Sequence, residues 1–323
     1  MEFQILLSNL TNPTLLFFVL GIAAARLKSD LEIPASSSKF ISLYLLFSIG
    51  FKGGQELAHS GFTDEILYSL AFGLAIASLI PLYTFSILKR KLSISDAGAV
   101  AAAYGSVSAV TFVAAIAFLE GQNIVSGGHM VAVMALMESP AIIVGVILML
   151  QFDKERTAGE KIDMKSIIHH SFTNGSVLMI LGSLIIGLIA DTKQAEGIKP
   201  FTTDIFKGFL AIFLLEMGMV TAKRFSAFVQ YGWFVSIFAI LVPAINGCVV
   251  AFISQYITAD AGNRFIFAIL AASASYIAVP AAMRLAAPKA DPGLYVPMAL
   301  GVTFPFNITI GMPLYFLIVN ATT

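Results

Sequence analysis

Charged residues, cysteine and tryptophan are all scarce in this chain of 323 residues. Asp, Glu, Lys and Arg make up 12% of it, whereas 58% is apolar. Because soluble domains are typically about 25% charged, a fold that faces water on all sides is excluded, and with it most soluble enzymes and nucleic-acid-binding proteins. The sequence therefore predicts an integral membrane protein whose surroundings are the lipid bilayer, with no nucleic-acid partner.

The few charges and the single cysteine exclude further classes. Nineteen basic residues balance nineteen acidic ones, so no attraction to a polyanion is indicated. Cys248 is the sole cysteine and allows neither an intrachain disulfide nor a cysteine zinc site. Walker, GxSxG and HExxH motifs are also missing from the sequence, so neither an enzyme nor a catalytic residue is predicted.

Apolar runs recur along the whole chain, and many have the length of about 20 residues that crosses a bilayer as a helix. They are too continuous for the alternating pattern of a membrane β-barrel. We therefore predict ten membrane-spanning helices. They lie near residues 13–27, 38–52, 65–88, 96–119, 128–151, 172–190, 204–222, 229–257, 264–285 and 293–319.

Lys and Arg are concentrated in every second connection between these spans. The odd-numbered connections carry 14 of them and the even-numbered ones five. The five are Lys52, Lys193, Lys199, Lys207 and Arg264. Because short loops rich in Lys and Arg stay in the cytoplasm, we expect a multi-pass protein of the bacterial plasma (inner) membrane with both termini in the periplasm.

The second half of the chain repeats features of the first. Residues 40–55 are echoed by 209–223, and residues 104–117 by 272–285. Since five spans is an odd number, the two copies have opposite orientations. Inverted repeats with broken helices at the bilayer midplane are typical of secondary transporters.

The predicted fold is therefore an all-α polytopic membrane protein with ten transmembrane helices in two inverted five-helix repeats, with broken helices at the midplane. The expected divisions are 11–151 for the first repeat, 152–170 for a cytoplasmic linker and 171–320 for the second repeat.

Hydroxyl and small residues cluster in two spans where breaks are expected. The hydroxyl residues are Ser106, Ser108 and Thr111 in the fourth span and Ser273 and Ser275 in the ninth. Such residues are also common where membrane helices pack closely, which is the alternative for either cluster alone. Their recurrence in both halves favours a binding site, because a half-helix that begins there offers N–H groups to a small anion.

Matching prolines lie beside polar residues in the fifth and tenth spans, where Glu138 precedes Pro140 and Asn307 follows Pro305. A proline frees a backbone carbonyl, and a carboxylate at this depth is costly unless it is paired or binds a cation. We interpret Glu138 as a sodium ligand; the alternative is a buried, protonated acid. For Glu216, a second intramembrane acid, we favour a structural pairing with a lysine over a coupling role.

Several longer motifs, spread over roughly residues 11–319, can be compared with known families. They are Asn12-Pro13-Thr14, Leu31-Glu32-Ile33-Pro34, the glycine-containing stretch 49–54, the serine-containing stretch 105–111, Met217-Gly218-Met219 and the stretch 271–288. In these motifs the chain resembles the sodium-dependent bicarbonate transporter family of the SbtA type.

The resemblance implies a homotrimer that works by an elevator mechanism. Helices 1, 2, 6 and 7 would form a gate domain, and helices 3–5 and 8–10 a core domain. It also implies a small trimeric PII-like regulatory protein that docks on the cytoplasmic face. Between the two domains it implies sites for bicarbonate and for sodium.

By position, the implied substrate-binding residues are Ser106, Ser108, Thr111, Ser273, Ser275 and Tyr276. The implied sodium-binding residues are Glu138, Ser108, Thr111, Ser275 and Asn307. The chain departs from the family pattern in three places. Glu138 stands where an aspartate is usual, Val110 replaces a serine, and the segment 272–276 lacks two hydroxyls and a carboxylate.

The leading hypothesis is a sodium-coupled symporter that carries bicarbonate or a similar small anion into the cell. An alternative keeps the fold but carries a small carboxylate, with coupling to sodium or to protons through Glu138 or Glu216. A third hypothesis is a membrane receptor or scaffold that does not transport.

Overall fold

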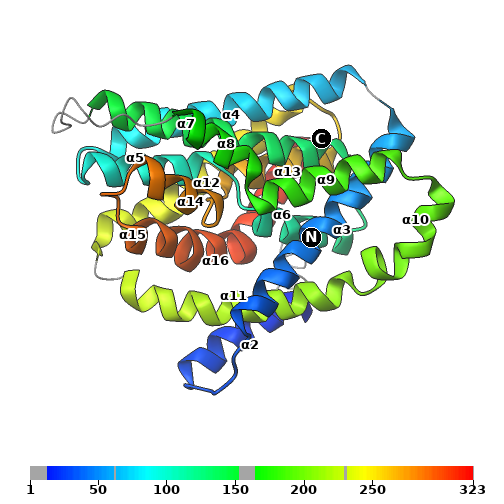
Figure 1. Cartoon of the computed structure of the whole chain (residues 1–323), viewed down its shortest axis with the longest axis horizontal. Coiled ribbons are helices and arrows are strands. Elements are labelled where there is room, and N and C mark those ends of the chain that lie inside the picture. The colour runs from blue at the N-terminus through cyan, green and yellow to red at the C-terminus, as the bar shows by residue number, and fades with distance from the viewer. Residues whose placement is uncertain (1–12, 62, 153–163, 229–230, 323) are drawn as a thin grey trace.

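The computed structural model describes residues 13–61, 63–152, 164–228 and 231–322, and it contains helices and no strands in these ranges (Figure 1). The helices are α2 (Pro13–Arg26), α3 (Ala35–Ser60), α4 (Asp64–Leu88), α5 (Ile94–Gly105), α6 (Ala109–Gly121), α7 (His129–Phe152), α8 (Met164–Thr173), α9 (Gly175–Ile189), α10 (Thr192–Lys199), α11 (Phe206–Phe228), α12 (Trp233–Ile253), α13 (Ala261–Ala272), α14 (Ala278–Ala286), α15 (Pro292–Pro297), α16 (Phe304–Phe306) and α17 (Met312–Ala321). Turns of π-helix lie at Pro200–Asp204, Met298–Thr303 and Asn307–Gly311, and a turn of 3₁₀-helix lies at Ser254–Tyr256.

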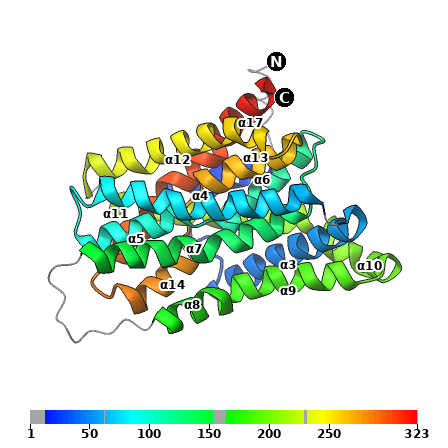
Figure 2. The ribbon, with the colours of Figure 1, turned by 90° about the horizontal axis from the view of Figure 1, so that it is seen from above.

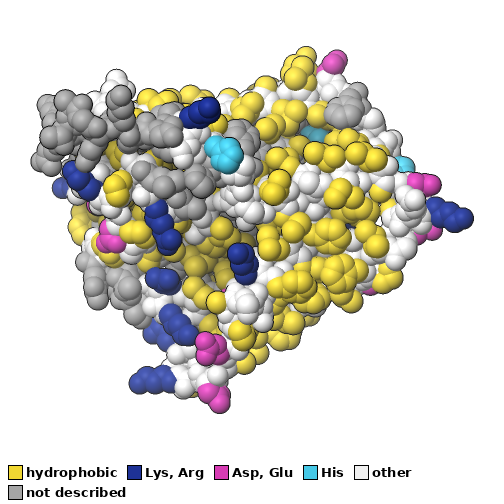
Figure 3. All heavy atoms as spheres, in the orientation of Figure 1, with side chains coloured by type: hydrophobic (Ala, Val, Ile, Leu, Met, Phe, Trp, Pro, Cys, Tyr) yellow, Lys and Arg dark blue, Asp and Glu magenta, His cyan; other side chains and the backbone are white. Residues whose placement is uncertain are grey.

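Six helical stretches of the described chain are long and apolar enough to cross a membrane. They are Asp64–Leu88, Ile94–Gly121, His129–Phe152, Thr192–Arg224, Trp233–Tyr256 and Pro292–Ala321. Three shorter apolar helices are Leu15–Arg26, Gly175–Ile189 and Ala261–Ala272. Hydrophobic side chains also cover much of the right half of the face in Figure 3, whereas several Lys and Arg side chains lie on its left half. The prediction of an all-helical, multi-pass membrane protein is confirmed, and the number of ten spans stays a prediction.

The helices pack in two sets. In the first, α2 lies against α11 and α3 lies against α9. In the second, α4, α5 and α7 pack together, and α12 packs against α13 and α17 (Figure 2). The half-length helices α6 and α13 meet inside the second set.

Glycines bring the helices of the first set into backbone contact. A Cβ atom at Gly218 of α11 would lie 2.1 Å from the carbonyl oxygen of Phe18 in α2. A Cβ atom at Gly54 of α3 would lie 2.1 Å from the carbonyl oxygen of Leu184 in α9. Close approach at small residues is how membrane helices gain van der Waals contact where lipid supplies no hydrophobic driving force.

The boundaries differ from the predicted ones near the linker. α8 begins at Met164, inside the predicted linker 152–170, of which residues 153–163 lie outside the described part. Asn174 separates α8 from α9, because its side chain accepts the N–H of Ser176 at 2.9 Å and so starts a new helix.

Arg264 does not lie in a connection, as the charge count assumed, but inside α13, where it is 1% exposed. Its guanidinium donates to the carbonyl of Ala251 at 3.1 Å and to that of Val319 at 3.4 Å. These carbonyls belong to the last turns of α12 and α17, so the guanidinium ties the ends of two helices to α13. Removing Arg264 from the count strengthens the charge bias between the two faces.

Candidate functional site

Two interrupted helices cross at their interruptions. The gap between α5 and α6 lies beside the gap between α13 and α14. Ser108 N–H donates to Ser273 Oγ at 3.0 Å, and Ser275 N–H donates to the carbonyl of Ala103 at 2.8 Å. A backbone N–H in each gap therefore finds its acceptor on the other interrupted helix. Inside a membrane such buried N–H groups need a partner within the protein.

Local sequence explains the first of these gaps. Ser108 is the N-cap of α6, and its Oγ accepts the N–H of Thr111 at 3.2 Å. The preceding helix ends at Gly105, where a Cβ atom would lie 2.3 Å from Cγ of Pro81 in α4. A small residue and a capping hydroxyl thus end one helix and begin the next within four positions.

A small cavity lies where the gaps cross. It is lined by Val107, Ser108, Ala109, Glu138, Ser176, Ser275, Tyr276 and Ile277. Its volume of about 20 Å³ holds one particle of the size of a water molecule. The N-termini of α6 and α14 border it, so the positive ends of two helix dipoles and the Glu138 carboxylate lie around the same space.

A second, larger cavity adjoins the first and is called the vestibule here. It measures about 1080 Å³ and lies between α3, α9, α11 and the start of α14. Ser176 and Ile277 line both cavities. Polar side chains of the vestibule include Ser38, Lys39 and Glu216. The two cavities therefore share part of their wall.

Four of the eight predicted site residues line the small cavity, namely Ser108, Ser275, Tyr276 and Glu138. The other four lie behind this lining. They are Ser106, Thr111, Ser273 and Asn307, all of them buried. The structure thus brings both halves of the chain and Glu138 to one place, and the roles of these residues stay predictions.

Two of the residues behind the lining hold the gaps in shape. Ser106 Oγ donates to the carbonyl of Glu138 at 3.4 Å and so ties the first gap to α7. Asn307 Nδ2 donates to the carbonyl of Ala272, the last residue of α13, at 2.8 Å, and its Oδ1 accepts the hydroxyl of Tyr315 at 3.2 Å. Both polar atoms of the Asn307 side chain are therefore used within the protein.

Glu216 has no lysine partner in the described part of the chain. Both ion pairs found there are formed by Glu120. Its Oε2 is buried without a hydrogen-bond partner among the described residues. The favoured interpretation of Glu216 as a structural ion-pair residue is therefore not supported, and its carboxylate lines the vestibule instead.

Ser176 is a lining residue that the sequence did not indicate. It lies in the first turn of α9, outside the two hydroxyl clusters and far from them in the chain. It reaches the small cavity because α9 packs against α3 and α7. No local signal in the sequence reports this packing.

Replacing Ser273 by Ala is expected to destabilise the protein by about 1–3 kcal/mol, because the buried N–H of Ser108 loses its acceptor. The midpoint of denaturant-induced unfolding in detergent measures the effect. Ser78→Ala is the matched control, since Ser78 is only partly buried and its hydroxyl donates within its own helix, to the carbonyl of Leu74. Equal midpoints for the two variants would contradict the role given to Ser273.

The fold and the crossing gaps define a multi-pass helical membrane protein with a polar site enclosed between helices. The family model of the Na+-dependent bicarbonate transporter superfamily matches residues 13–320, nearly the whole chain. The chain belongs to this superfamily, as the resemblance of its motifs predicted. Membership places it among membrane transporters, with sodium dependence and bicarbonate as the family's ion and anion. No curated protein matches the chain.

Proposed function

We propose that this protein is a secondary active transporter that carries bicarbonate, or a similar small anion, into the cell together with sodium. The observation that carries the proposal is the crossing of two helix gaps beside Glu138. Two helix N-termini suit an anion, and the carboxylate with nearby hydroxyls is the oxygen set of a hard cation.

Coupling between sodium and the anion follows because the Glu138 carboxylate and two positive helix ends lie around the same small cavity. Sodium beside Glu138 neutralises the carboxylate that would otherwise repel an anion. The anion then binds mainly to the sodium-loaded protein, and by linkage it raises the affinity for sodium equally. Because the small cavity has room for one ion-sized particle, we infer that the anion enters only after α6 and α14 move apart from α9.

The proposed movement is of the elevator type, with α2, α3, α9 and α11 as the gate domain and the remaining spans as the core domain. The close pairing of α2 with α11 and of α3 with α9 supports the division, and α11 also contacts the turn Met298–Thr303 of the other set. The vestibule lies between α14 of the core and three gate helices. With the charge bias that assigns the odd connections to the cytoplasm, the vestibule opens inward and the termini are periplasmic.

Assembly as a homotrimer in the bacterial inner membrane, in two inverted repeats of five spans, is part of the same proposal, and so is a cytoplasmic PII-like partner. Their support is the resemblance of the motifs. The partner would face the connection that contains residues 153–163, which lie outside the described part of the chain.

Uptake of labelled bicarbonate into proteoliposomes tests the function. An inward sodium gradient is expected to drive accumulation, and replacing sodium by potassium at equal ionic strength is expected to abolish it. Empty liposomes and liposomes with a collapsed gradient are the controls. Accumulation at the same rate without sodium would refute the coupling.

Small carboxylates with proton coupling are the second candidate. Glu216 in the vestibule favours it, because this acid has no ion-pair partner among the described residues. Tyr276 also gives the small cavity one aromatic wall. In the same vesicles this function would appear as formate or acetate uptake driven by an inward proton gradient, with little competition from bicarbonate.

A further inference from the structure

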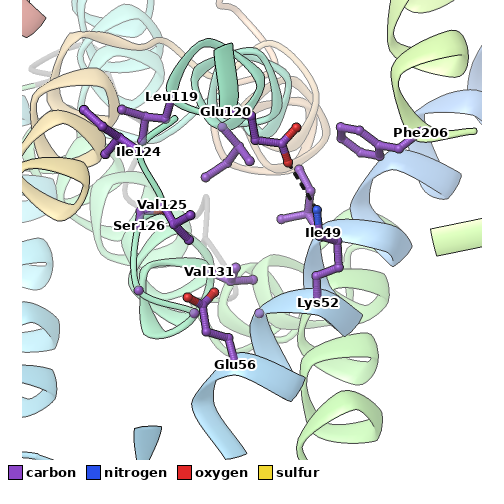
Figure 4. Close-up of a pocket in the computed structure, with 14 residues that line it drawn as sticks. Ile49, Lys52, Glu56, Leu119, Glu120, Ile124, Val125, Ser126, Val131 and Phe206 are labelled. Atoms are coloured by element: carbon purple, nitrogen blue, oxygen red, sulfur yellow. Dashed lines mark hydrogen bonds and ion pairs between the residues drawn. The ribbon is translucent and has the colours of Figure 1, made fainter. Parts of the chain in front are cut away.

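A third cavity lies at the other end of α3 from the vestibule (Figure 4). It measures about 240 Å³ and is bounded by α3, the end of α6, the connection at residues 122–128 and the start of α11. The charge bias assigns this end of the molecule to the outside. Apolar side chains form most of the wall, among them Ile49, Leu119 and Val131.

Glu120, at the edge of this cavity, is held by two lysines from other helices. Lys52 Nζ of α3 lies 3.2 Å from Glu120 Oε1, and Lys207 Nζ of α11 lies 3.5 Å from Glu120 Oε2. Each carboxylate oxygen therefore faces its own ammonium group. Glu120 belongs to α6, one of the interrupted helices, whereas both lysines belong to the helices of the first set.

The lysine pair remains within reach of solvent. The side chains of Lys52 and Lys207 are 39% and 65% exposed, and that of Glu120 is 27% exposed. Ion pairs with this much exposure are individually weak. Glu120 is therefore an occupant that another anion can replace, provided that the helices leave room for it.

We propose that Lys52 and Lys207 form an outer capture site for a small planar anion of the bicarbonate or carboxylate class, and that Glu120 occupies this site in the conformation described here. A bicarbonate ion presents the same planar pair of oxygens to two ammonium groups as the Glu120 carboxylate does. This inference rests on the proposed function, since an anion enters from the outside only if the protein transports one.

The outer end of the protein is closed in this conformation, and this closure places the Glu120 carboxylate between the two lysines. A Cβ atom at Gly128 would lie 2.1 Å from the carbonyl oxygen of Gly53, so the connection after α6 touches the backbone of α3. When the interrupted helices move away from α3 and α11, Glu120 leaves with α6. Two ammonium groups then lie at the mouth of the 240 Å³ cavity without Glu120, and Glu56 of α3 remains as the acid in its lining. Their field raises the local concentration of anions at this entrance.

The double substitution Lys52→Gln with Lys207→Gln tests the site through the kinetics of sodium-driven uptake. The KM for external bicarbonate is expected to rise at least about threefold, because the electrostatic attraction at the entrance is lost. The maximal rate is expected to stay within about twofold, because the inner site is intact. Raising the ionic strength should increase the wild-type KM and leave that of the double variant unchanged.

Two further variants show whether charge at this place is the cause. Lys193→Gln removes the same charge from α10 on the same face, away from Glu120, and is expected to keep the wild-type KM. Lys52→Arg with Lys207→Arg keeps both charges and is expected to keep the KM within about twofold. A double Gln variant that behaves like Lys193→Gln would overturn the proposal.

Protection of lysines from a membrane-impermeant acylating reagent tests the site without transport. In Glu120→Gln, bicarbonate is expected to slow the labelling of Lys52 and Lys207 but not that of Lys193, as read by mass spectrometry. Equal labelling rates with and without bicarbonate would overturn the capture site. Because this readout needs no sodium gradient, it separates a failure of the capture site from a failure of the proposed function.

Discussion

Replacing Glu138 by Gln is expected to lower the apparent sodium affinity of uptake by about 10- to 100-fold, because one charged ligand is replaced by a neutral one of the same shape. Glu138 contributes the only carboxylate in the lining of the small cavity among the described residues. The remaining oxygens there belong to hydroxyls and backbone, which bind a hard cation without neutralising it. The half-saturating sodium concentration, measured at saturating bicarbonate, reports the change.

Glu196→Gln is the matched control for Glu138→Gln. Glu196 is an exposed acid on α10, so the same change of charge and shape is made away from the cavity. Glu138→Asp, which keeps the charge, is expected to retain sodium dependence with a smaller loss of affinity. Unchanged sodium affinity in Glu138→Gln would remove Glu138 from the sodium site. Loss of proton dependence instead would favour the small-carboxylate function.

Gly218→Ala is expected to destabilise the protein by about 3 kcal/mol or more, although it adds only one methyl group. The new Cβ atom would lie 2.1 Å from the carbonyl oxygen of Phe18, so α2 and α11 have to separate. A carbonyl of a helix backbone does not turn aside as a flexible side chain does. The midpoint of unfolding by SDS in mixed micelles measures the loss.

Gly208→Ala, on the same helix, is the control with the opposite expected sign. A Cβ atom at Gly208 meets no atom within 4 Å. Alanine there removes the conformational cost of glycine in a helix and is expected to stabilise the protein by up to about 1 kcal/mol. Destabilisation of equal size in both variants would show that the α2–α11 contact is not the cause.

Much of the helical organisation was predictable because it depends on local composition. An apolar run of about 20 residues spans a bilayer wherever it occurs, and the helices Asp64–Leu88 and His129–Phe152 lie within one residue of the predicted spans 65–88 and 128–151. The gap after Gly105 was also predictable, since a serine N-cap and small residues favour a helix start at a defined place. Arg264 was misplaced because composition does not report that two helix ends lie beside it.

The candidate site was predictable only in part. Repetition within the sequence pointed to Ser108 and Ser275, which line one cavity. The lysine partner favoured for Glu216 is not found in the described residues, and Ser176 was not anticipated. The surroundings of Glu216 and the position of Ser176 depend on where α11 and α9 lie relative to the interrupted helices. Separation along the chain does not predict this arrangement.

The ion pairs of Glu120 likewise depend on the tertiary structure and not on a motif in the sequence. Lys52, Glu120 and Lys207 were visible in the sequence as three separate charges in the even connections, without any common motif. Packing alone joins them, because the end of α6 and the start of α11 lie beside α3.

By itself, the sequence determined that the chain is helical, embedded in lipid and interrupted by polar residues in both halves, because hydrocarbon forces the backbone to satisfy its own hydrogen bonds locally. The tertiary structure decided which interruptions meet, which side chains face a cavity and which charges pair. Those choices depend on backbone contacts between helices distant in the chain, such as the one between α2 and α11 at Gly218.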